Sequence, residues 1–411
     1  SRRRRVLSQE AALKYFLLGA FSSALFLFGI ALLFGYSASL SYAGIGTAAA
    51  AAVGMDGMGI VGLVLVLVGL LFKVGAVPFH AWVPDVYQGA PTPVTGFMAA
   101  ATKTAAFAAI ARLLYVAAPG FGWDLAPVLW TVAIASMLLG TVAAIVQTDI
   151  KRTLAYSSVA HAGFALVAII ALTPEGPSAL LFYLLAYSFA TVGAFAIVTL
   201  VRESDPAGNI TGEATHLSQW AGLGRRSPVL AAAMSLFLRA FAGIPLTAGF
   251  MGKFTAFVAA ADGGAWAIVL IAVAASIAAA FFYVRVIVLM FFTRPEESGK
   301  PGAQAVKPSP LTAAAIAVCA VGTVFLGVWP TPVLDLLAQA ADQRIEQLEG
   351  LLLVFVQRVA LGIAAPADDL AQMVERAQML APQMVESLEQ HLLLDIVHHL
   401  GGVLLHPFGI G

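Results

Sequence analysis

The sequence has few of the residues that ordinarily carry redox or metal chemistry. Cys319 is the only cysteine among 411 residues, and it lies in an apolar run. A lone cysteine excludes disulfides, cysteine-ligated iron–sulfur clusters and cysteine-rich zinc sites within the chain. The HExxH, GxSxG and P-loop motifs are absent, and the glycines and arginines of residues 222–227 follow no βαβ pattern. Any redox cofactor would therefore belong to a partner chain.

Charged residues are also scarce, and this sets the class of the protein. Only 11% of the residues are charged and 60% are hydrophobic, which gives a mean hydropathy of +0.91. So little polar surface cannot cover a water-soluble globule of this length. The sequence therefore predicts a protein of the lipid bilayer.

Long apolar stretches recur along the chain. Nine of them are long enough to cross about 30 Å of hydrocarbon as helices. They cover approximately residues 13–34, 58–76, 93–116, 127–148, 153–172, 178–201, 228–260, 265–292 and 311–330. The seventh and eighth are too long for one plain span, and we place a break in the seventh at Gly243-Ile244-Pro245. The sequence thus predicts an all-α, polytopic transmembrane helix bundle.

Basic residues in the loops alternate between the two sides of the membrane. If the N-terminus is cytoplasmic, the cytoplasmic segments carry Arg2–Arg5, Lys151, Arg152, Arg202, Arg225, Arg226, Arg294, Lys300 and Lys307. The outside loops carry no lysine or arginine. This agrees with the positive-inside rule and predicts the direction of each span. The loop at 202–227 is accordingly interpreted as a solvated cytoplasmic connection.

Some cations lie inside the predicted spans, namely Lys73, Lys103, Arg112, His161, Arg239, Lys253 and Arg285. A cation at the centre of a membrane helix costs roughly 2.5–3.5 kcal/mol, so several together require a hydrated interior or acidic partners. Arg112 and Arg285 are close enough to helix ends to reach the headgroups. The lysines fit that interpretation less well, and the role of Arg239 stays open.

Two of these lysines accompany interrupted helices. Lys73 is followed by Gly75 and Pro78, and Lys253 follows the break at 243–245. Glycine and proline interruptions in corresponding segments of two halves are typical of discontinuous helices in inverted repeats, where an ion path crosses the membrane. Burial brings proton loss from a lysine within reach of neutral pH, whereas arginine stays charged. The pattern therefore favours a proton relay over a fixed anion site.

Four segments carry a resemblance to a known family. They are KYFLLGAFSSALFLFGIALLFG, LLFKVGAVPFHAWVPDVYQGAPTPVTGFMAAATKTAAFAAIARLL, QTDIKRTLAYSSVAHAGFAL and FAGIPLTAGFMGKF. Over roughly residues 8–335 the sequence resembles the subunit N family of bacterial proton-translocating NADH:quinone oxidoreductase, respiratory complex I. That family is antiporter-like and has fourteen helices, and this sequence begins at what resembles the sixth. The resemblance thus leads us to expect a chain without the first five helices, among them the helix whose glutamate pairs with the lysine matched by Lys73.

The resemblance implies a domain organisation. Residues 1–116 would be the remainder of a first antiporter-like half, with three helices. Residues 117–292 would be the second half, with five helices and a broken helix near 243–249. Residues 293–335 would hold the final transmembrane helix, and 336–411 would be an amphipathic tail of unknown role.

The resemblance also implies the site. Lys73 matches the lysine of the family's broken seventh helix, Lys103 that of the eighth and Lys253 that of the broken twelfth, and together they would line a central hydrophilic axis. His161 matches a tenth-helix motif and is a weaker candidate, since a hydrogen-bonded core histidine is equally expected. His80, Trp82, Pro84 and Asp85 match the cytoplasmic side of the seventh helix, where they either end the helix or take up protons.

The function implied is translocation of protons across the bacterial inner membrane, coupled to quinone reduction in partner subunits. The chain itself would hold no cofactor, and NADH, FMN, iron–sulfur clusters and quinone would bind to those partners. Its own partners would be other membrane subunits and the bilayer, with no nucleic acid. Two alternatives stay open: a structural scaffold of the membrane arm that pumps no protons, and a cation/proton antiporter subunit.

Overall fold

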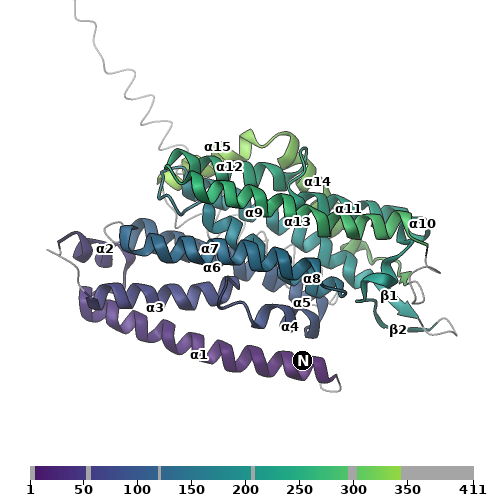
Figure 1. The fold of residues 1–411 in the computed structure, drawn as a ribbon, viewed down its shortest axis with the longest axis horizontal. Coiled ribbons are helices and arrows are strands. Elements are labelled where there is room, and N and C mark those ends of the chain that lie inside the picture. Colours follow the sequence, from purple (N-terminus) through teal and green to yellow (C-terminus); the bar gives the residue numbers. More distant parts are fainter. Residues whose placement is uncertain (1–4, 52–56, 119–121, 205–208, 295–302, 344–411) are drawn as a thin grey trace, which may run out of the picture. The chain divides into compact units, whose positions relative to one another are not determined.

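The computed structural model describes residues 5–51, 57–118, 122–204, 209–294 and 303–343 (Figure 1). All of them belong to the first of two units, Ser1–Ile363. The second unit, Ala364–Gly411, lies outside the described residues. So does most of the predicted amphipathic tail, of which only the part up to Gln343 is described.

The described elements of the first half of the chain are all helices. Its helices are α1 (Val6–Ser37), α2 (Tyr42–Ala51), α3 (Gly57–Val74), α4 (Trp82–Gly89), α5 (Thr92–Phe97), η1 (Met98–Thr102), α6 (Lys103–Arg112) and η2 (Leu113–Ala117). The last four follow one another without a gap and make one span, Thr92–Ala117.

The second half contains the most deeply buried of the long helices, Gly176–Leu200. Its elements are α7 (Gly122–Ile145), α8 (Ile150–Val167), α9 (Gly176–Leu200), α10 (Leu223–Arg226), α11 (Pro228–Ala242), α12 (Ala248–Asp262), α13 (Trp266–Phe292), α14 (Pro310–Val328) and α15 (Thr331–Gln343). Between α9 and α10 lie β1 (Val201–Ser204), β2 (Ile210–Glu213) and η4 (Leu217–Trp220), and β3 (Gln304–Ala305) precedes α14.

Each predicted span has a helical counterpart, and the all-α transmembrane prediction is confirmed. Seven helices in the described part of the chain are long and apolar enough to cross a membrane. The two other predicted spans differ for physical reasons. Helix α8 is more polar, because it carries Ser157, Ser158 and His161, and the seventh predicted span is divided into α11 and α12, of 15 residues each.

Helices α9 and α1 are the two extremes of burial in this bundle. In α9, 94% of the membrane-spanning window is buried, and it packs against α5, α11, α12 and α14. A helix that is apolar on all sides is expected in such a central place. In α1 only 17% of the window is buried, and it packs along α3. Most of the α1 side chains therefore face outward, which suits lipid.

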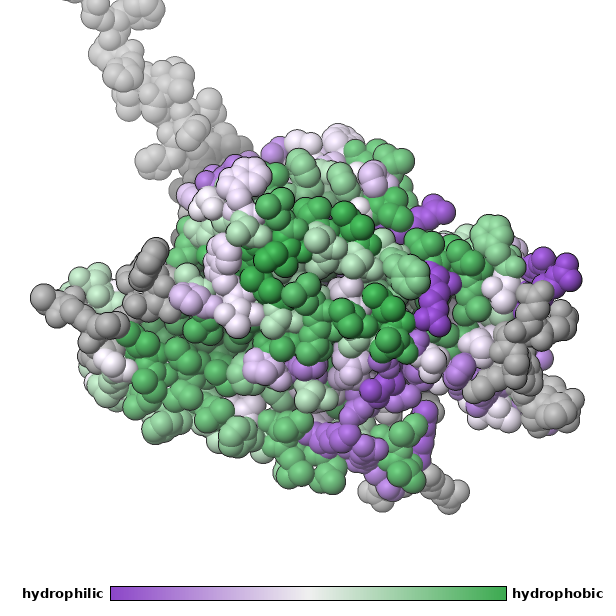
Figure 2. Space-filling model, in the orientation of Figure 1, coloured by the Kyte–Doolittle hydropathy of each residue, from purple (hydrophilic) through white to green (hydrophobic). Residues whose placement is uncertain are grey.

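Hydrophilic residues gather at one end of the bundle. Figure 2 shows apolar residues over most of the visible face and hydrophilic ones concentrated on the side of α4, α10 and the strands. This is the side to which the distribution of lysine and arginine assigns the cytoplasm.

The two predicted interruptions have the same backbone design. Helix α3 ends at Val74, and Gly75 follows with φ +72°; helix α11 ends at Ala242, and Gly243 follows with φ +78°. In each case the residue after the glycine donates its backbone N–H to a carbonyl five residues earlier. Ala76 donates to Leu71 and Ile244 donates to Arg239, both at 3.0 Å. These are Schellman motifs, which satisfy the last carbonyls of a helix at a left-handed residue.

The connection after α9 is more ordered than the solvated loop that the sequence predicts. Strands β1, β2 and β3 form a small antiparallel sheet in the order β2-β1-β3. Behind it Trp220 is fully buried, and its indole N–H donates to the carbonyl of Ala214 at 2.8 Å. Burial of this tryptophan anchors the connection to the bundle.

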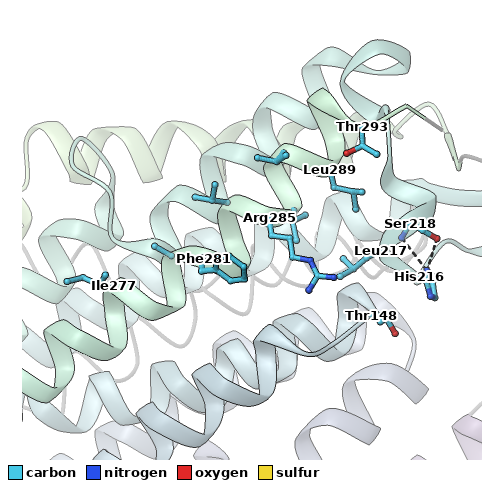
Figure 3. Close-up of a pocket in the computed structure, with 13 residues that line it drawn as sticks. Thr148, His216, Leu217, Ser218, Ile277, Phe281, Arg285, Leu289 and Thr293 are labelled. Atoms are coloured by element: carbon cyan, nitrogen blue, oxygen red, sulfur yellow. Dashed lines mark hydrogen bonds between the residues drawn. The ribbon is translucent and has the colours of Figure 1, made fainter. Parts of the chain in front are cut away.

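A groove lies along the surface of α13, beside η4 (Figure 3). Its volume is about 730 Å³. Apolar side chains of α13 line most of its length, and Thr148, His216 and Ser218 line one end.

Candidate functional site

Three of the four predicted relay residues are buried in one region of the bundle. Lys103 on α6 is 3% exposed, His161 on α8 is 4% exposed and Lys253 on α12 is 4% exposed. Lys73, near the end of α3, is only half-buried. Charged side chains are rarely buried to this degree without polar partners.

Lys103 is held by α8. Its Nζ donates to the carbonyl of Ser158 at 2.5 Å and to the Ser158 hydroxyl at 2.7 Å, and it lies 5.3 Å from the centre of the Tyr187 ring. A π-helical turn, η1, directly precedes it. Such turns reorient the side chains that follow and are frequent at functional sites.

Lys253 is bound to the end of the helix before it. Its Nζ donates to the carbonyls of Phe241 at 2.9 Å and Ala242 at 3.2 Å, and to the hydroxyl of Ser276 at 2.8 Å. The two carbonyls are the last ones of α11, where the helix dipole is negative. The interruption at Gly243 thus creates the binding site for this ammonium group.

His161 connects several aromatic residues between the two lysines. Its Nδ1 lies 2.5 Å from the Tyr183 hydroxyl, and its Nε2 lies 3.2 Å from the Tyr283 hydroxyl. Tyr283 in turn lies 2.6 Å from the hydroxyl of Ser157. Both ring nitrogens are therefore hydrogen-bonded, and tyrosine hydroxyls can act as donor or acceptor toward either tautomer.

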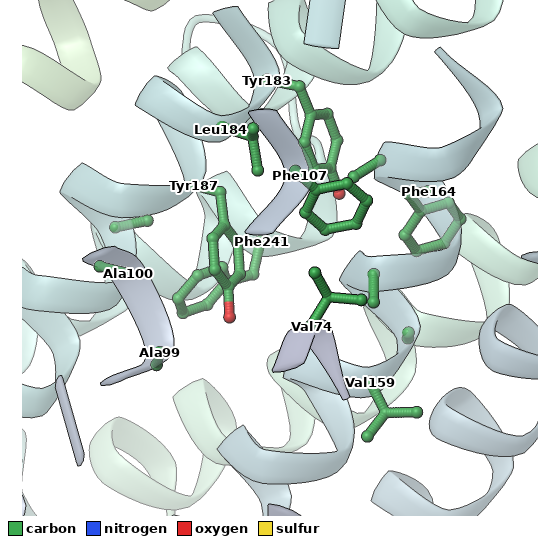
Figure 4. Close-up of a cluster of buried hydrophobic side chains, with 14 of the residues drawn as sticks. Val74, Ala99, Ala100, Phe107, Val159, Phe164, Tyr183, Leu184, Tyr187 and Phe241 are labelled. Carbon is green, nitrogen blue, oxygen red and sulfur yellow. The ribbon is translucent and has the colours of Figure 1, made fainter. Parts of the chain in front are cut away.

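Aromatic rings close the space between Lys103 and Lys253. The Tyr187 ring, which Lys103 contacts, lies 4.9 Å from the His161 ring. The Phe164 ring lies 5.8 Å from the His161 ring and 4.6 Å from Lys253 Nζ. Figure 4 shows Tyr187 beside Phe241 in this core. Of the three predicted residues, His161 is thus linked to each lysine through a shared ring.

A small cavity opens beside His161. It has a volume of about 10 Å³ and is lined by His161, Tyr183, Tyr187 and neighbouring small residues of α9, α11 and α12. This is close to the volume that a single water molecule requires, and the lining offers polar partners.

Lys73 is not joined to this group. Among the described residues its Nζ contacts the face of the Tyr15 ring at 5.9 Å and makes no hydrogen bond. The Tyr15 ring packs on Trp82 at 5.1 Å. The structure therefore brings Lys103, His161 and Lys253 together and leaves Lys73 apart, on the side of α1.

The residues after Lys73 contact the ends of neighbouring helices. The Trp82 indole N–H donates to the carbonyl of Phe72 at 2.9 Å, which completes the end of α3. The Asp85 carboxylate accepts hydrogen bonds from Lys14 at 2.5 Å and from Arg152 at 2.7 Å. Partial burial by itself would raise the pKa of Asp85, but these two hydrogen bonds hold it below its usual value.

His80 and Pro84 belong to the same segment of the chain as Asp85. Burial lowers the pKa of His80, and its Nδ1 has no hydrogen-bond partner among the described residues. Pro84 lies in the first turn of α4, where proline is tolerated.

Sequence reasoning missed a buried ion pair. Lys151 is fully buried at the start of α8, where its Nζ donates to the carbonyl of Ala90 at 2.9 Å and lies 3.5 Å from Glu213 on β2. The Thr92 hydroxyl donates to the same carboxylate oxygen at 2.7 Å. The sequence places Lys151 among solvated loop cations, and no local signal distinguishes it from them. The three tyrosines around His161 were also missed, since tyrosine is common in apolar helices.

The arginines of the spans lie outside the buried group. Arg112 stacks on the Tyr42 ring at 4.8 Å, and Arg285 donates to the carbonyl of Ile145 at 2.9 Å. Arg239 is exposed in the last turn of α11.

Comparison with known proteins places the chain among membrane subunits. A family model described as NADH:quinone oxidoreductase/Mrp antiporter, TM, matches residues 1–278. The chain is 67% identical over 341 residues to NADH-quinone oxidoreductase subunit N of Beutenbergia cavernae, covering 83% of this chain and 64% of the relative. It is 62% identical over 351 residues to NADH-quinone oxidoreductase subunit N 3 of Streptomyces griseus subsp. griseus. This match covers 83% of this chain and 62% of that relative. The chain thus spans somewhat less than two thirds of the length of these relatives.

The fold is also similar to a chain of a solved complex. A chain of respiratory complex I from Thermus thermophilus with bound aureothin matches with a TM-score of 0.68 and 39% identity. The match covers 81% of this chain and 70% of that one.

Proposed function

The chain belongs to the NADH:quinone oxidoreductase/Mrp antiporter family of transmembrane proteins, and from this premise we propose that it relays protons through Lys73, Lys103, His161 and Lys253 as a subunit of an NADH:quinone oxidoreductase. It is a multi-pass protein of the bacterial inner membrane. Its partners in this proposal are other membrane subunits of such a complex. Those partners reduce quinone and hold NADH, FMN and iron–sulfur clusters, while this chain carries no redox centre of its own.

One observation supports the proposal above all others: two buried lysines are each linked through a shared aromatic ring to one doubly hydrogen-bonded histidine. Lys103 and Lys253 are bound by serine hydroxyls and carbonyls, and no carboxylate of the described residues is among their hydrogen-bond partners. Without a counter-ion, burial of a positive charge on either lysine is costly, and hydrogen bonds alone must offset that cost. His161 and its tyrosines supply groups that both give and accept protons.

No described hydrogen bond joins either lysine to His161, so in this relay water would carry the proton between each lysine and the histidine, and the cavity beside His161 has room for one such molecule. Lys103 gives up a proton and keeps its hydrogen bond as a neutral amine, because the Ser158 hydroxyl can reverse from acceptor to donor. His161 takes a proton at one nitrogen, and the tyrosine bonded to that nitrogen turns its hydroxyl to accept. Lys253 receives a proton and then satisfies all three N–H donors on Phe241, Ala242 and Ser276.

The test measures proton pumping in the assembled complex. Lys103→Ala and Lys253→Ala, made separately and together, are expected to reduce NADH-driven proton translocation by roughly a hundredfold, the usual contribution of a proton-transfer residue. Arg239→Leu is the matched control, since it also removes a cation from a spanning helix. Normal pumping in the lysine variants, with the complex assembled, would remove the proposal.

The position of Lys73 favours a second candidate, a scaffold that pumps no protons. Among the described residues this lysine has only a ring contact and takes no part in the buried group. A scaffold would tolerate Lys103→Ala with unchanged assembly and unchanged proton flux. A cation/proton antiporter subunit would instead give Na⁺-dependent flux without NADH.

A further inference from the structure

We propose that the groove on α13 binds an anionic phospholipid, with the phosphate on Arg285 and an acyl chain along the apolar residues of the helix. The groove lies outside the buried relay group and serves no role in the proposed function. Its volume of about 730 Å³ lies within the range of ligand pockets.

The apolar part of the groove is a continuous stripe. Ile277, Phe281, Val284 and Val288 all lie along one face of α13, and between 43% and 70% of each side chain is exposed. Their spacing of three or four residues places them on one side of the helix. In a spanning helix such a stripe faces hydrocarbon, so an acyl chain is the occupant that its chemistry fits.

The polar part begins at Arg285. Its guanidinium donates one hydrogen bond, to the carbonyl of Ile145 at the end of α7, and makes no other among the described residues. Figure 3 shows the side chain extending from α13 toward Leu217 and the segment that carries His216 and Ser218. The remaining N–H groups form a planar donor set, which suits the oxygens of a phosphate.

The charge around Arg285 is complementary to an anion. The described residues that line the groove include no aspartate or glutamate. The nearby carboxylate of Asp149 is buried and accepts hydrogen bonds from Lys151 N, Arg152 N and Gln88. Helix α10, which packs against α13, adds the exposed cations Arg225 and Arg226. A negatively charged headgroup is therefore favoured over a zwitterionic one.

The depth of the groove also fits a headgroup. Arg285 lies two turns before the end of α13, and Thr148, His216 and Ser218 lie in connections between spans. The distribution of loop lysines and arginines predicts that this end is cytoplasmic. Basic pockets between helices on that side are typical sites for anionic lipid headgroups.

The test compares two lipids with the same acyl chains. The purified full chain, stripped of native lipid in detergent, is titrated with dioleoylphosphatidylglycerol or dioleoylphosphatidylcholine, and bound lipid is counted by native mass spectrometry. We expect phosphatidylglycerol to bind about tenfold more tightly, the usual effect of one charge-assisted contact. Arg285→Gln should abolish this preference and Arg285→Lys should keep part of it, while Arg239→Gln, which alters an exposed arginine elsewhere, should leave it unchanged.

Each contrary result would overturn the proposal. Equal binding of the two lipids, or an undiminished preference in Arg285→Gln, would show that Arg285 holds no headgroup. Displacement of phosphatidylglycerol by excess inorganic phosphate would indicate an anion site without an acyl chain. A photo-crosslinker placed at Phe281 in native membranes should capture lipid, and capture of a neighbouring protein subunit instead would show that a protein covers the groove.

Discussion

At the scale of single residues, tyrosine hydroxyls distinguish this buried site from an ordinary apolar core. Tyr283 lies between Ser157 and His161, and Tyr183 occupies the other ring nitrogen. Every polar atom of the imidazole is thus engaged. A fully satisfied group of this kind is rigid, and the loss of one member leaves another without its partner.

Tyr283→Phe should therefore have two effects. Removing the hydroxyl leaves His161 Nε2 and Ser157 without a partner, which should lower the free energy of unfolding by about 1–3 kcal/mol. It should also slow proton translocation, because one contact of the relay is lost.

The control is Tyr115→Phe, which removes a hydroxyl bonded to the carbonyl of Thr173. It should be destabilising to a similar degree, as measured by thermal unfolding in detergent, with proton translocation unaffected. Equal pumping in both variants would argue against a part for Tyr283 in proton transfer.

At the scale of helices, the interruption between α11 and α12 holds a glycine in the left-handed region. A Cβ atom at Gly243, where φ is +78°, would lie 3.0 Å from Cδ of Lys253. Gly264 has a similar φ of +81°, but a Cβ there would meet nothing within 4 Å. A side chain at Gly264 would therefore cause backbone strain alone, whereas a side chain at Gly243 would cause the same strain and also displace Lys253.

Gly243→Ala and Gly264→Ala should each cost about 1–2 kcal/mol of stability through the backbone alone. Only Gly243→Ala should in addition reduce proton translocation, since it pushes Lys253 away from the carbonyls of Phe241 and Ala242. Melting temperatures and pumping rates measured on the same two variants would check this. A pumping defect of the same size in Gly264→Ala would assign the effect to strain rather than to Lys253.

The helices and their breaks could be predicted from the sequence, whereas their polar contacts could not. Long apolar runs identify the spans, and the glycines and prolines at 75–78 and 243–245 mark both interruptions. Lys103 and Lys253 stand out because a charge within an apolar run is costly. Lys151 does not, since its burial depends on Glu213, which lies 62 residues further along the chain. The short sheet was missed for the same reason: strands of two to four residues are stabilised by distant pairing rather than by local pattern.

At the scale of the whole described bundle, ionic contacts join α1, α4 and α8. Lys14 contributes from α1, Asp85 from α4 and Arg152 from α8. Because the pKa of Asp85 is lowered in the folded protein, the carboxylate stabilises the fold above its ordinary pKa of about 4, and this stabilisation is lost as the pH falls through the lowered value.

Asp85→Asn should accordingly lower the melting temperature at about pH 7. The difference from the unmodified protein should begin to shrink as the pH falls below about 4 and should vanish once the pH is below the lowered pKa of Asp85. The groups are partly exposed, so the effect should be modest and should shrink with added salt. Melting curves over this pH range provide the check. A difference that persists unchanged in acid would mean that Asp85 acts through packing.

The contact of Trp82 with the Tyr15 ring gives the protein an intrinsic optical reporter. The Tyr15 ring has the ammonium of Lys73 on it at 5.9 Å and the indole of Trp82 at 5.1 Å. In a variant that keeps Trp82 as its only tryptophan, all tryptophan fluorescence would come from a ring that contacts Tyr15, and Lys73 lies over that same tyrosine ring. Its fluorescence would report a movement of the Lys73 side chain, or of α1 against α4, without any attached dye.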